Sequence, residues 1–397
     1  MDAKLDQAVI GKEPEFVPTY IDVSSAVHAK AGIGRYAGSL ARALLDMGPG
    51  RFALFYNRRR GSQLPPGLDH APSRTVRAGY KPWRMAVWLG QLASISFDRL
   101  VPDADLFHAT EHLLPPLAGI PTVLTVHDMI FRLFPEHQKR LNYWYLNATM
   151  PLYCRRAGAI ITVSESSKRD IVEHYGIDSD KIAVIYEAAS PEFVPGPATA
   201  IDQVRRQYSL PDHFLIHVGT IEPRKNLTRL VEALHHLRSE GLRIPLLVVG
   251  GKGWLSEGLY QKLEELEMRD AVHFSGYVPA PDLPLLYCAA RAAVMPSVYE
   301  GFGLPVLEAM ACGTPVASSN CSSLPEIGGQ AAQFFDPYSV EEMAAVIGTI
   351  WTDSEMRAEM KQDGLAQAAR FSWDRAAQET QKVYETVLDD HARVSLA

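Results

Sequence analysis

The segment Met295–Met310 reads Met-Pro-Ser-Val-Tyr-Glu-Gly-Phe-Gly-Leu-Pro-Val-Leu-Glu-Ala-Met. An apolar run that is typical of a buried strand ends at Ser297, two glycines follow at Gly301 and Gly303, and Pro305 stands where a helix would begin. This succession of strand, turn and helix is one unit of a parallel α/β sheet. We therefore expect the surrounding residues to form a doubly wound domain.

Short apolar runs alternate with amphipathic stretches on both sides of this segment. The predicted strands and helices of the first half are residues 19–25, 34–46, 52–57, 106–110, 122–128, 159–165, 166–175 and 182–187. Those of the second half are residues 214–220, 227–240, 246–250, 259–268, 272–278, 283–290, 292–297, 304–311 and 315–319. The alternation predicts an α/β protein with two doubly wound, Rossmann-like domains that face each other across a cleft.

The periodicity lapses between Glu187 and His213, where four prolines occur. Such a stretch is typical of a linker, so we predict an N-terminal domain over residues 1–195 and a C-terminal domain over residues 196–397. The length of 397 residues agrees with two domains, because single cores rarely grow beyond about 250–300 residues. The last amphipathic helix, at about 373–388, is a candidate to pack back on the N-terminal domain.

The composition, with 47% hydrophobic and 21% charged residues, is that of a packed globular protein and argues against disorder and coiled coil. The net charge of -7 argues against general nucleic-acid binding. No apolar stretch is long enough to span a membrane, and the first residues lack the features of a signal peptide. We expect a cytoplasmic protein whose four cysteines, at positions 154, 288, 312 and 321, are reduced.

The turn between Glu300 and Leu304 predicts an anion site. Backbone N–H groups at the start of a helix are unpaired and the helix dipole favours negative charge there, so a diphosphate would fit. Glu300 lies before the turn and Glu308 lies about one helical turn inside the helix. Carboxylates so placed suit hydrogen bonds from sugar hydroxyls. The structural alternative is that Glu308 is a dipole partner and Glu300 a solvated loop residue.

Arg224 and Lys225 lie between a predicted strand and a predicted helix, directly before Asn226, an expected N-cap residue. Two cations beside a helix N-terminus would stabilise the charge of a leaving nucleoside diphosphate. A solvated pair of turn residues is the structural alternative.

Glu300, Gly301-Phe-Gly-Leu-Pro305 and Glu308 resemble the E-x7-E signature of the retaining glycosyltransferases of family 4, which have the GT-B fold. The resemblance extends to Val218-Gly-Thr-Ile-Glu-Pro-Arg-Lys-Asn226 and to Met310-Ala-Cys-Gly-Thr-Pro-Val316, and it covers nearly all of the chain. It implies transfer of a sugar from a nucleotide sugar to an acceptor, with retention at the anomeric carbon and without a metal or another cofactor in the donor site.

The resemblance also implies roles for single residues. Glu300 would meet the donor sugar, Glu308 the ribose and Lys225 the diphosphate, while His127, at the end of a predicted strand, would lie near the reacting sugar. We assign catalysis to Glu300, His127 and Lys225. A buried histidine that is bonded to the backbone is the structural alternative for His127.

Many members have an arginine at the position of Thr220, and Arg224 is the candidate to replace it. Base and sugar choice would depend on the shape around Gly250, Tyr277 and Glu300. The further predicted donor-binding residues are Gly32, Gly219, Gly250, Tyr277, Gly301, Phe302, Gly303 and Leu304, with Gly34 and Arg35 as second-tier candidates.

Asp103-Ala-Asp105 matches the D-x-D pattern with which another glycosyltransferase fold holds a divalent ion on the diphosphate. It precedes the predicted strand at 106–110 and so stands at the end of that strand opposite to a ligand crevice. We therefore predict no metal site.

The first domain has a local excess of positive charge, since residues 51–100 contain nine basic and two acidic side chains. The stretch Tyr80-Lys-Pro-Trp-Arg-Met-Ala-Val-Trp-Leu89 combines tryptophans with cations, as do surfaces that bind anionic membranes. Arg51, Arg58, Arg59 and Arg60 precede it, and Phe131–Phe134 and Tyr143–Tyr145 add aromatic residues. We hypothesise that this domain rests on the cytoplasmic face of the inner membrane and takes a lipid-linked acceptor. Core packing with solubilising charge is the alternative.

These features together predict a retaining glycosyltransferase that moves a hexose. The chain resembles most the mannosyltransferases that assemble bacterial surface polysaccharides, so GDP-mannose is the leading donor, with UDP-glucose and activated rhamnose as alternatives. A nucleotide-sugar epimerase or hydrolase could use the same scaffold, and it would turn over the donor without an acceptor. A catalytically silent carbohydrate-binding protein is disfavoured, because Glu300, Lys225, Glu308 and His127 are all present.

Overall fold

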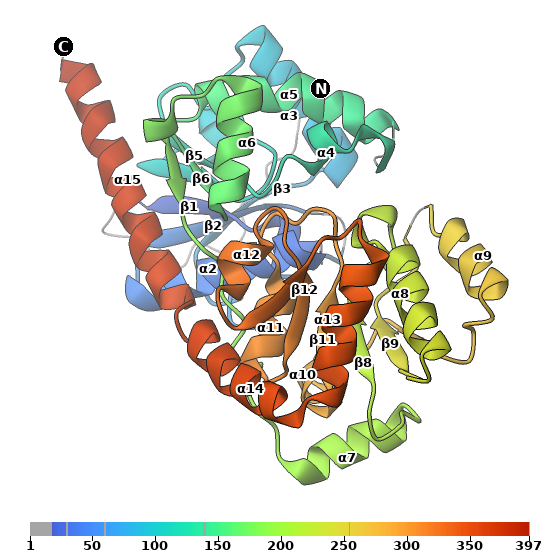
Figure 1. The fold of residues 1–397 in the computed structure, drawn as a ribbon. Helices are drawn as coiled ribbons and strands as arrows, with labels where there is room; N and C mark the ends of the chain where they lie inside the picture. Colours follow the sequence, from blue (N-terminus) through green and yellow to red (C-terminus); the bar gives the residue numbers. More distant parts are fainter. Residues whose placement is uncertain (1–17, 29–30, 59–60, 138–139, 254, 397) are drawn as a thin grey trace. The chain divides into compact units, whose positions relative to one another are not determined.

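The computed structural model describes residues 18–28, 31–58, 61–137, 140–253 and 255–396 (Figure 1). The chain divides into two compact units. Unit 1 comprises Met1–Arg132, Lys139–Glu187 and Trp373–Ala397, and unit 2 comprises Leu133–Gln138 and Ala188–Ser372. The boundary therefore follows Glu187 rather than residue 195. The start of the chain, where no signal peptide was expected, and Arg59 and Arg60 lie outside the described residues.

Unit 1 is built on a parallel sheet. Its strands are β1 (Thr19–Asp22), β2 (Phe52–Asn57), β3 (Ser73–Val76), β4 (Leu106–Ala109), β5 (Thr122–Val126), β6 (Ala159–Thr162) and β7 (Ile182–Val184). Within the described residues they form one seven-stranded sheet in the order β3-β2-β1-β4-β5-β6-β7, with parallel neighbours throughout. The strand order reverses direction between β1 and β4, as it does in a doubly wound sheet.

Helices from both ends of the chain cover this sheet. They are α1 (Ser24–Val27), α2 (Ala31–Met47), α3 (Tyr80–Ala93), α4 (Ile130–Leu133), α5 (Arg140–Arg156), α6 (Glu165–Tyr175) and α15 (Trp373–Leu396). The C-terminal helix α15 packs against α2, β5 and β6 (Figure 1). Helix α6 begins at a serine N-cap, because Ser164 Oγ accepts a hydrogen bond from Ser167 N at 3.1 Å.

Unit 2 repeats the architecture. Its strands are β8 (Leu215–Val218), β9 (Leu246–Val249), β10 (Val272–Gly276), β11 (Ala292–Met295), β12 (Val316–Ser319) and β13 (Ala332–Phe335). In the part of unit 2 that the structure describes, six parallel strands follow the order β10-β9-β8-β11-β12-β13, so the direction reverses between β8 and β11. Two doubly wound α/β domains are thus confirmed.

The helices of unit 2 fall into two groups. They are α7 (Ala198–Gln207), α8 (Leu227–Ser239), α9 (Glu257–Glu265), α10 (Asp282–Ala289), α11 (Leu304–Ala311), α12 (Leu324–Gly328), α13 (Val340–Thr352) and α14 (Ser354–Ala368). Helix α8 packs against α9 and α13, and α11 packs against α10, α12 and α14. Leu230, Leu234, Leu263 and Ile347 are buried where the first group meets the sheet.

The structure adds elements to those that the periodicity predicts. Strands β3 and β13 lie at the edges of their sheets, and β3 is only partly buried, so its apolar pattern is weak. Helix α7 lies inside the predicted linker, where its neighbour Tyr208 donates a hydrogen bond to Asp282 Oδ2 at 2.6 Å. Among the described residues, no helix combines the length and the apolar character needed to cross a bilayer.

Candidate active site

The predicted anion loop lies at the switch point of unit 2. Strands β8 and β11 are neighbours, and the loops that leave their carboxyl ends carry Arg224–Lys225 and Glu300–Gly303 respectively. Open α/β sheets bind ligands outside the carboxyl ends of the strands at such a point. The fold therefore brings together the two sequence motifs that are separated by about 75 residues along the chain.

Glu300 is held by two cations. Lys225 Nζ lies 2.6 Å from Glu300 Oε1, and Arg224 Nη1 lies 2.8 Å from Glu300 Oε2. Arg224 Nη2 also pairs with Glu222 Oε1 at 2.5 Å, and Arg224 Nη1 donates to the carbonyl oxygen of Tyr299 at 2.7 Å. Glu300 and Lys225 are each only 7% exposed, so these ion pairs are shielded from water.

The charges of this cluster shift one another's pKa values. Burial alone would raise the pKa of Glu300, but the positive charges of Arg224 and Lys225 lower it to about 2. Burial also lowers the pKa of Lys225, and the negative charge of Glu300 opposes that shift. At neutral pH Glu300 is therefore a carboxylate, and it lies between the side chains of Lys225 and Arg224.

Hydrogen bonds fix the loop that follows Glu300. Ser322 Oγ accepts from Glu300 N at 2.8 Å, and Ser323 Oγ donates to the carbonyl oxygens of Glu300 and Phe302 at 2.9 and 2.7 Å. Gly303 has a φ of 108° and precedes α11 without a side-chain cap, and Pro305 stands in the first turn as predicted. The N-cap residue Gly303 thus supplies no side-chain cap to the first amides of α11.

Glu308 lies on α11 and is buried, with 1% of its surface exposed. Tyr287 donates its hydroxyl hydrogen to Glu308 Oε2 at 3.3 Å. This contact orients the carboxylate of Glu308, and the burial of Glu300 shows that Glu300 is not the solvated loop residue of the structural alternative.

The predicted glycines differ in what they do. A Cβ atom on Gly250 would lie 2.1 Å from Gly219 O, so the loops after β8 and β9 meet backbone to backbone. Tyr277, in contrast, is 91% exposed, and Thr220 is exposed as well. Asn226 occupies the N-cap position of α8, but its amide donates to the carbonyl oxygens of Pro296 and Pro337 instead of capping the helix.

His127 lies in unit 1 and is 5% exposed. Its Nε2 donates to the carbonyl oxygen of Thr110 at 2.9 Å, and its Nδ1 lies 3.6 Å from Glu187 Oε1. Burial would lower the pKa of His127, but the hydrogen bond and the charge of Glu187 raise it above its usual value. Both ring nitrogens are thus engaged by groups of unit 1, which is the geometry of the structural alternative.

The glycine-rich segment of unit 1 is part of helix α2. Gly32 is exposed and has room around it, whereas a Cβ atom on Gly34 would lie 2.8 Å from Ser25 O. Gly34 therefore permits close packing of α2 on α1. Of the D-x-D carboxylates, Asp103 pairs with Arg74 at 3.3 Å and Asp105 accepts from Thr19 at 2.9 Å. Among the described residues, no three metal-ligating side chains group together.

Sequence reasoning missed several residues of the site. Glu222 pairs with Arg224 although the motif alone assigns it no role, and the signal for this pair is a carboxylate two residues before two cations. Ser322 and Ser323 follow β12 without any recognised pattern, and Tyr287 looks like a core residue of α10. His217 on β8 is likewise indistinguishable from a core residue by sequence.

Two family models of glycosyltransferases match the chain. The model described as Glycosyltransferase Family 4 matches residues 31–193, and the model described as Glycosyl transferases group 1 matches residues 201–367. The O-antigen chain mannosyltransferase B of Escherichia coli is 36% identical over 282 residues, which cover 70% of this chain and 74% of that relative. The chain belongs to glycosyltransferase family 4.

This family-4 glycosyltransferase is also 34% identical over 272 residues to the serotype-specific mannosyltransferase WbdA of Escherichia coli, covering 66% of this chain and 33% of WbdA. It thus spans about a third of WbdA. Among solved structures it is similar to HepE of Anabaena in complex with UDP and glucose, with a TM-score of 0.71, 21% identity, and coverage of 90% of this chain and 96% of HepE. The fold is that of the GT-B glycosyltransferases, as the signature implied.

Proposed function

We propose that this enzyme transfers mannose from GDP-mannose, with retention, to a lipid-linked saccharide acceptor in the synthesis of a surface polysaccharide. Its relatives at 34–36% identity are named O-antigen chain mannosyltransferase B and serotype-specific mannosyltransferase WbdA. The observation that carries the proposal is the buried cluster of Lys225, Arg224 and Glu300 at the carboxyl ends of β8 and β11. UDP-glucose and activated rhamnose are the alternative donors.

The cluster suits a reaction in which a nucleoside diphosphate departs. Lys225, Arg224 and the first amides of α11 supply positive charge for the leaving diphosphate without a metal ion. Glu300 accepts hydrogen bonds from hydroxyls of the donor sugar, and Glu308 accepts them from the ribose. The acceptor hydroxyl attacks on the face that the diphosphate leaves, so catalysis is positional and electrostatic.

The donor is tested by thermal unfolding of the full chain with GDP, UDP, GDP-mannose, UDP-glucose and dTDP-rhamnose, in the absence of metal. A ligand at a hundred times its Kd stabilises the folded state by about 2.7 kcal/mol. We expect GDP and GDP-mannose to raise the Tm and UDP to leave it unchanged. Turnover of GDP-mannose without an acceptor would favour the epimerase or hydrolase instead.

Glu300→Gln tests the role of the carboxylate. The amide keeps the size of the side chain but removes the charge between Lys225 and Arg224, so we expect transfer to fall by about a hundredfold or more. The control is Glu264→Gln, because Glu264 is an exposed residue of α9 that pairs with Arg269 outside the site. Near-normal transfer by Glu300→Gln, with Glu264→Gln also active, would count against the assigned role.

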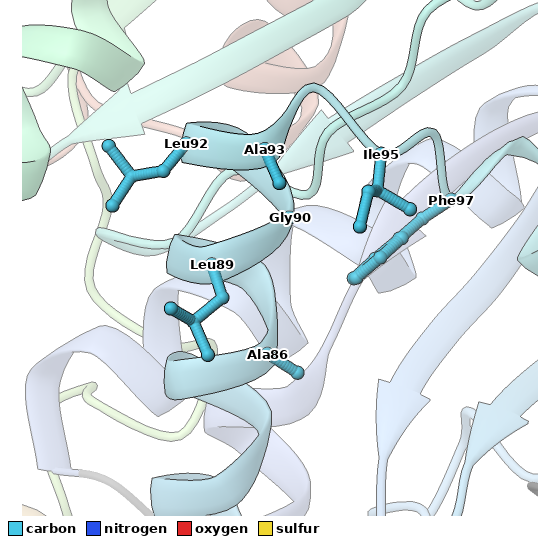
Figure 2. A pocket seen from close by; sticks show the side chains of 7 residues that line it. All are labelled: Ala86, Leu89, Gly90, Leu92, Ala93, Ile95 and Phe97. Carbon is cyan, nitrogen blue, oxygen red and sulfur yellow. The ribbon is translucent and has the colours of Figure 1, made fainter. Parts of the chain in front are cut away.

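A surface of unit 1 fits the membrane part of the proposal. Helix α3 and the loop behind it border an apolar groove of about 420 Å³, in which Ile95 and Phe97 lie beside the turns that carry Ala86 and Ala93 (Figure 2). Leu89 and Leu92 are 56% and 60% exposed. Such an apolar face is typical of surfaces that bind partners or membranes.

Helix α5 contacts α3 and exposes apolar side chains of its own. Arg84 on α3 donates to Asn142 Oδ1 on α5 at 3.2 Å and stacks over the Tyr145 ring. Helix α5 exposes Leu141 and Trp144 at 80% and 67%, and the exposed cations Lys81 and Arg140 belong to the same two helices. Exposed apolar side chains next to cations suit an anionic lipid surface.

Flotation with vesicles of phosphatidylglycerol and phosphatidylethanolamine tests this surface. We expect the wild type to float and Leu92→Ser/Trp144→Ser to float less, since both changes remove exposed apolar area without touching the core. Vesicles of phosphatidylcholine alone are the control for charge. Equal flotation of wild type and variant, or none with anionic lipid, would remove the membrane from the proposal.

A further inference from the structure

His217 on β8 has a polar atom that the described contacts do not use. The side chain is fully buried, and its Nδ1 lies 3.0 Å from the carbonyl oxygen of Val294. Because a carbonyl oxygen only accepts, Nδ1 carries the hydrogen and Nε2 holds a lone pair. Nε2 is buried and has no hydrogen-bond partner among the described residues. A buried acceptor without a donor is costly and calls for an explanation.

His217 lies where strands β8 and β11 separate. The pairing of β8 with β11 ends at Ile216 and Ala293, one residue before His217. A Cβ atom placed on Gly219 would lie 3.4 Å from His217 Nε2 and 3.1 Å from Lys225 Cε. The imidazole of His217 and the side chain of Lys225 therefore border the same space beside Gly219.

The charged groups that act on His217 are Lys225, Arg224 and Glu300. Burial and the positive charge of Lys225 lower the pKa of His217 to about 4, so the imidazole is neutral at pH 7. A neutral ring does not repel Lys225, and its lone pair offers an acceptor for the ammonium group.

We infer that His217 is a positioning residue, whose Nε2 accepts a hydrogen bond from Lys225 when Glu300 turns from Lys225 to the hydroxyls of the donor sugar. The inference rests on the proposed function. In the structure, Glu300 Oε1 accepts a hydrogen bond from one of the three N–H groups of the Lys225 ammonium group. When hydroxyls of the sugar bind the carboxylate of Glu300, the imidazole of His217 replaces it as the acceptor for Lys225. The lysine then stays charged and aligned with the diphosphate.

Two amide substitutions separate the functions of the two ring nitrogens. His217→Asn keeps a donor near the position of Nδ1 but has no acceptor near that of Nε2, whereas His217→Gln places an amide oxygen near Nε2. We expect His217→Asn to lower kcat/KM for GDP-mannose about tenfold, chiefly through KM. The alkaline limb of its pH profile should move to lower pH, because Lys225 then loses its proton more readily.

His217→Gln should recover most of the loss in kcat/KM and most of the shift of the pH profile. The control is His273→Asn, which changes an exposed histidine on β10 of the same sheet and should behave as wild type. A purely structural role would lower the Tm of both His217 variants without moving the alkaline limb. A His217→Asn enzyme with the kcat/KM and the pH profile of the wild type would overturn the inference.

The imidazole ¹⁵N resonances of His217 test the same idea in the unmodified chain, should the variants fail to fold. We expect a neutral ring with hydrogen on Nδ1, and an Nε2 resonance that moves upfield when GDP-mannose is added. Hydrogen on Nε2, or no response to a bound donor, would refute the role of His217. A wild-type chain that neither binds a nucleotide nor transfers sugar would instead refute the proposed function, and this role with it.

Discussion

Gly250 and Gly251 are neighbours in sequence that differ in their tolerance of a side chain. Gly250 has a φ of 146°, and a Cβ atom there would lie 2.1 Å from Gly219 O. Gly251 has no neighbouring atom within 4 Å of the same position. Because backbone cannot move aside as the end of a flexible side chain can, Gly250 is required by the approach of the two loops.

We expect Gly250→Ala to lower the free energy of unfolding by about 1–3 kcal/mol or more, from backbone strain and the displacement of the loop after β8. Gly251→Ala is the matched control and should change that free energy by no more than about 0.5 kcal/mol. Urea denaturation of both variants measures the difference. Equal free energies of unfolding for the two variants would show that the backbone contact with Gly219 does not require glycine at position 250.

Some contacts of single residues can be predicted from the sequence and others cannot. The juxtaposition of Lys225 and Glu300 was predictable, because both follow strands and parallel strands present their carboxyl ends at one edge. The pairing of Arg224 with Glu222 depends on side-chain conformations in a 3-10 turn that no periodicity encodes. A histidine inside an apolar strand, such as His217, reads as core until the opening of the sheet beside it is known.

At the scale of elements, helix α15 is fastened to unit 1 by a chain of buried polar groups. The hydroxyl of Tyr384 lies 2.6 Å from His108 Nδ1, and His108 Nε2 lies 2.7 Å from Thr125 Oγ1. Thr125 Oγ1 lies 3.1 Å from the hydroxyl of Tyr36 on α2, whose ring stacks edge-on against His127. The chain joins a helix near the end of the sequence to the neighbourhood of a predicted catalytic residue.

Tyr384→Phe removes one link of this chain and leaves a nitrogen of His108 buried without a partner. We expect a loss of about 1–3 kcal/mol in the free energy of unfolding, since an unsatisfied buried group costs its full desolvation. Tyr338→Phe is the control, because Tyr338 is 59% exposed. A Tm of Tyr384→Phe equal to that of wild type would mean that water replaces the hydroxyl.

Elements with a buried apolar face were predictable to within a few residues, and β2 and α11 agree with their predictions residue for residue. The edge strand β3 was missed, since a partly exposed strand lacks a full apolar run. Helix α7 was read as a linker because of the surrounding prolines, yet Pro197 stands at its N-cap, where proline is compatible with a helix. The partner of α15 was left open, because an amphipathic pattern shows that a helix packs but not against what.

At the scale of the whole molecule, each unit buries a neutral histidine. Burial lowers the pKa of His108 in unit 1 to about 3 and that of His217 in unit 2 to about 4, from 6.5. The unfolded chain therefore takes up protons at higher pH than the folded chain does. The contribution of these two histidines to stability is complete above about pH 6.5, the pKa in the unfolded chain, and declines as the pH falls toward their folded pKa values.

We expect the free energy of unfolding to fall by about 1.4 kcal/mol per pH unit for each of these histidines once the pH is below 6.5. Urea denaturation at pH 7.5, 6.0 and 5.0 measures the slope. Glu300 does not contribute in this window, because its pKa of about 2 keeps its ion pairs formed. A stability that stays constant from pH 7.5 to 5.0 would contradict the neutral, buried state of both rings.

Helix α15 completes unit 1, although it follows all of unit 2 in the sequence. The whole sheet of unit 1 and all of unit 2 leave the ribosome before α15 does. Until α15 has been synthesised, the apolar surface that it covers is exposed and His108 lacks the hydroxyl of Tyr384. The nascent chain can therefore complete unit 2 first, and unit 1, although encoded first, completes its fold only once α15 has been made.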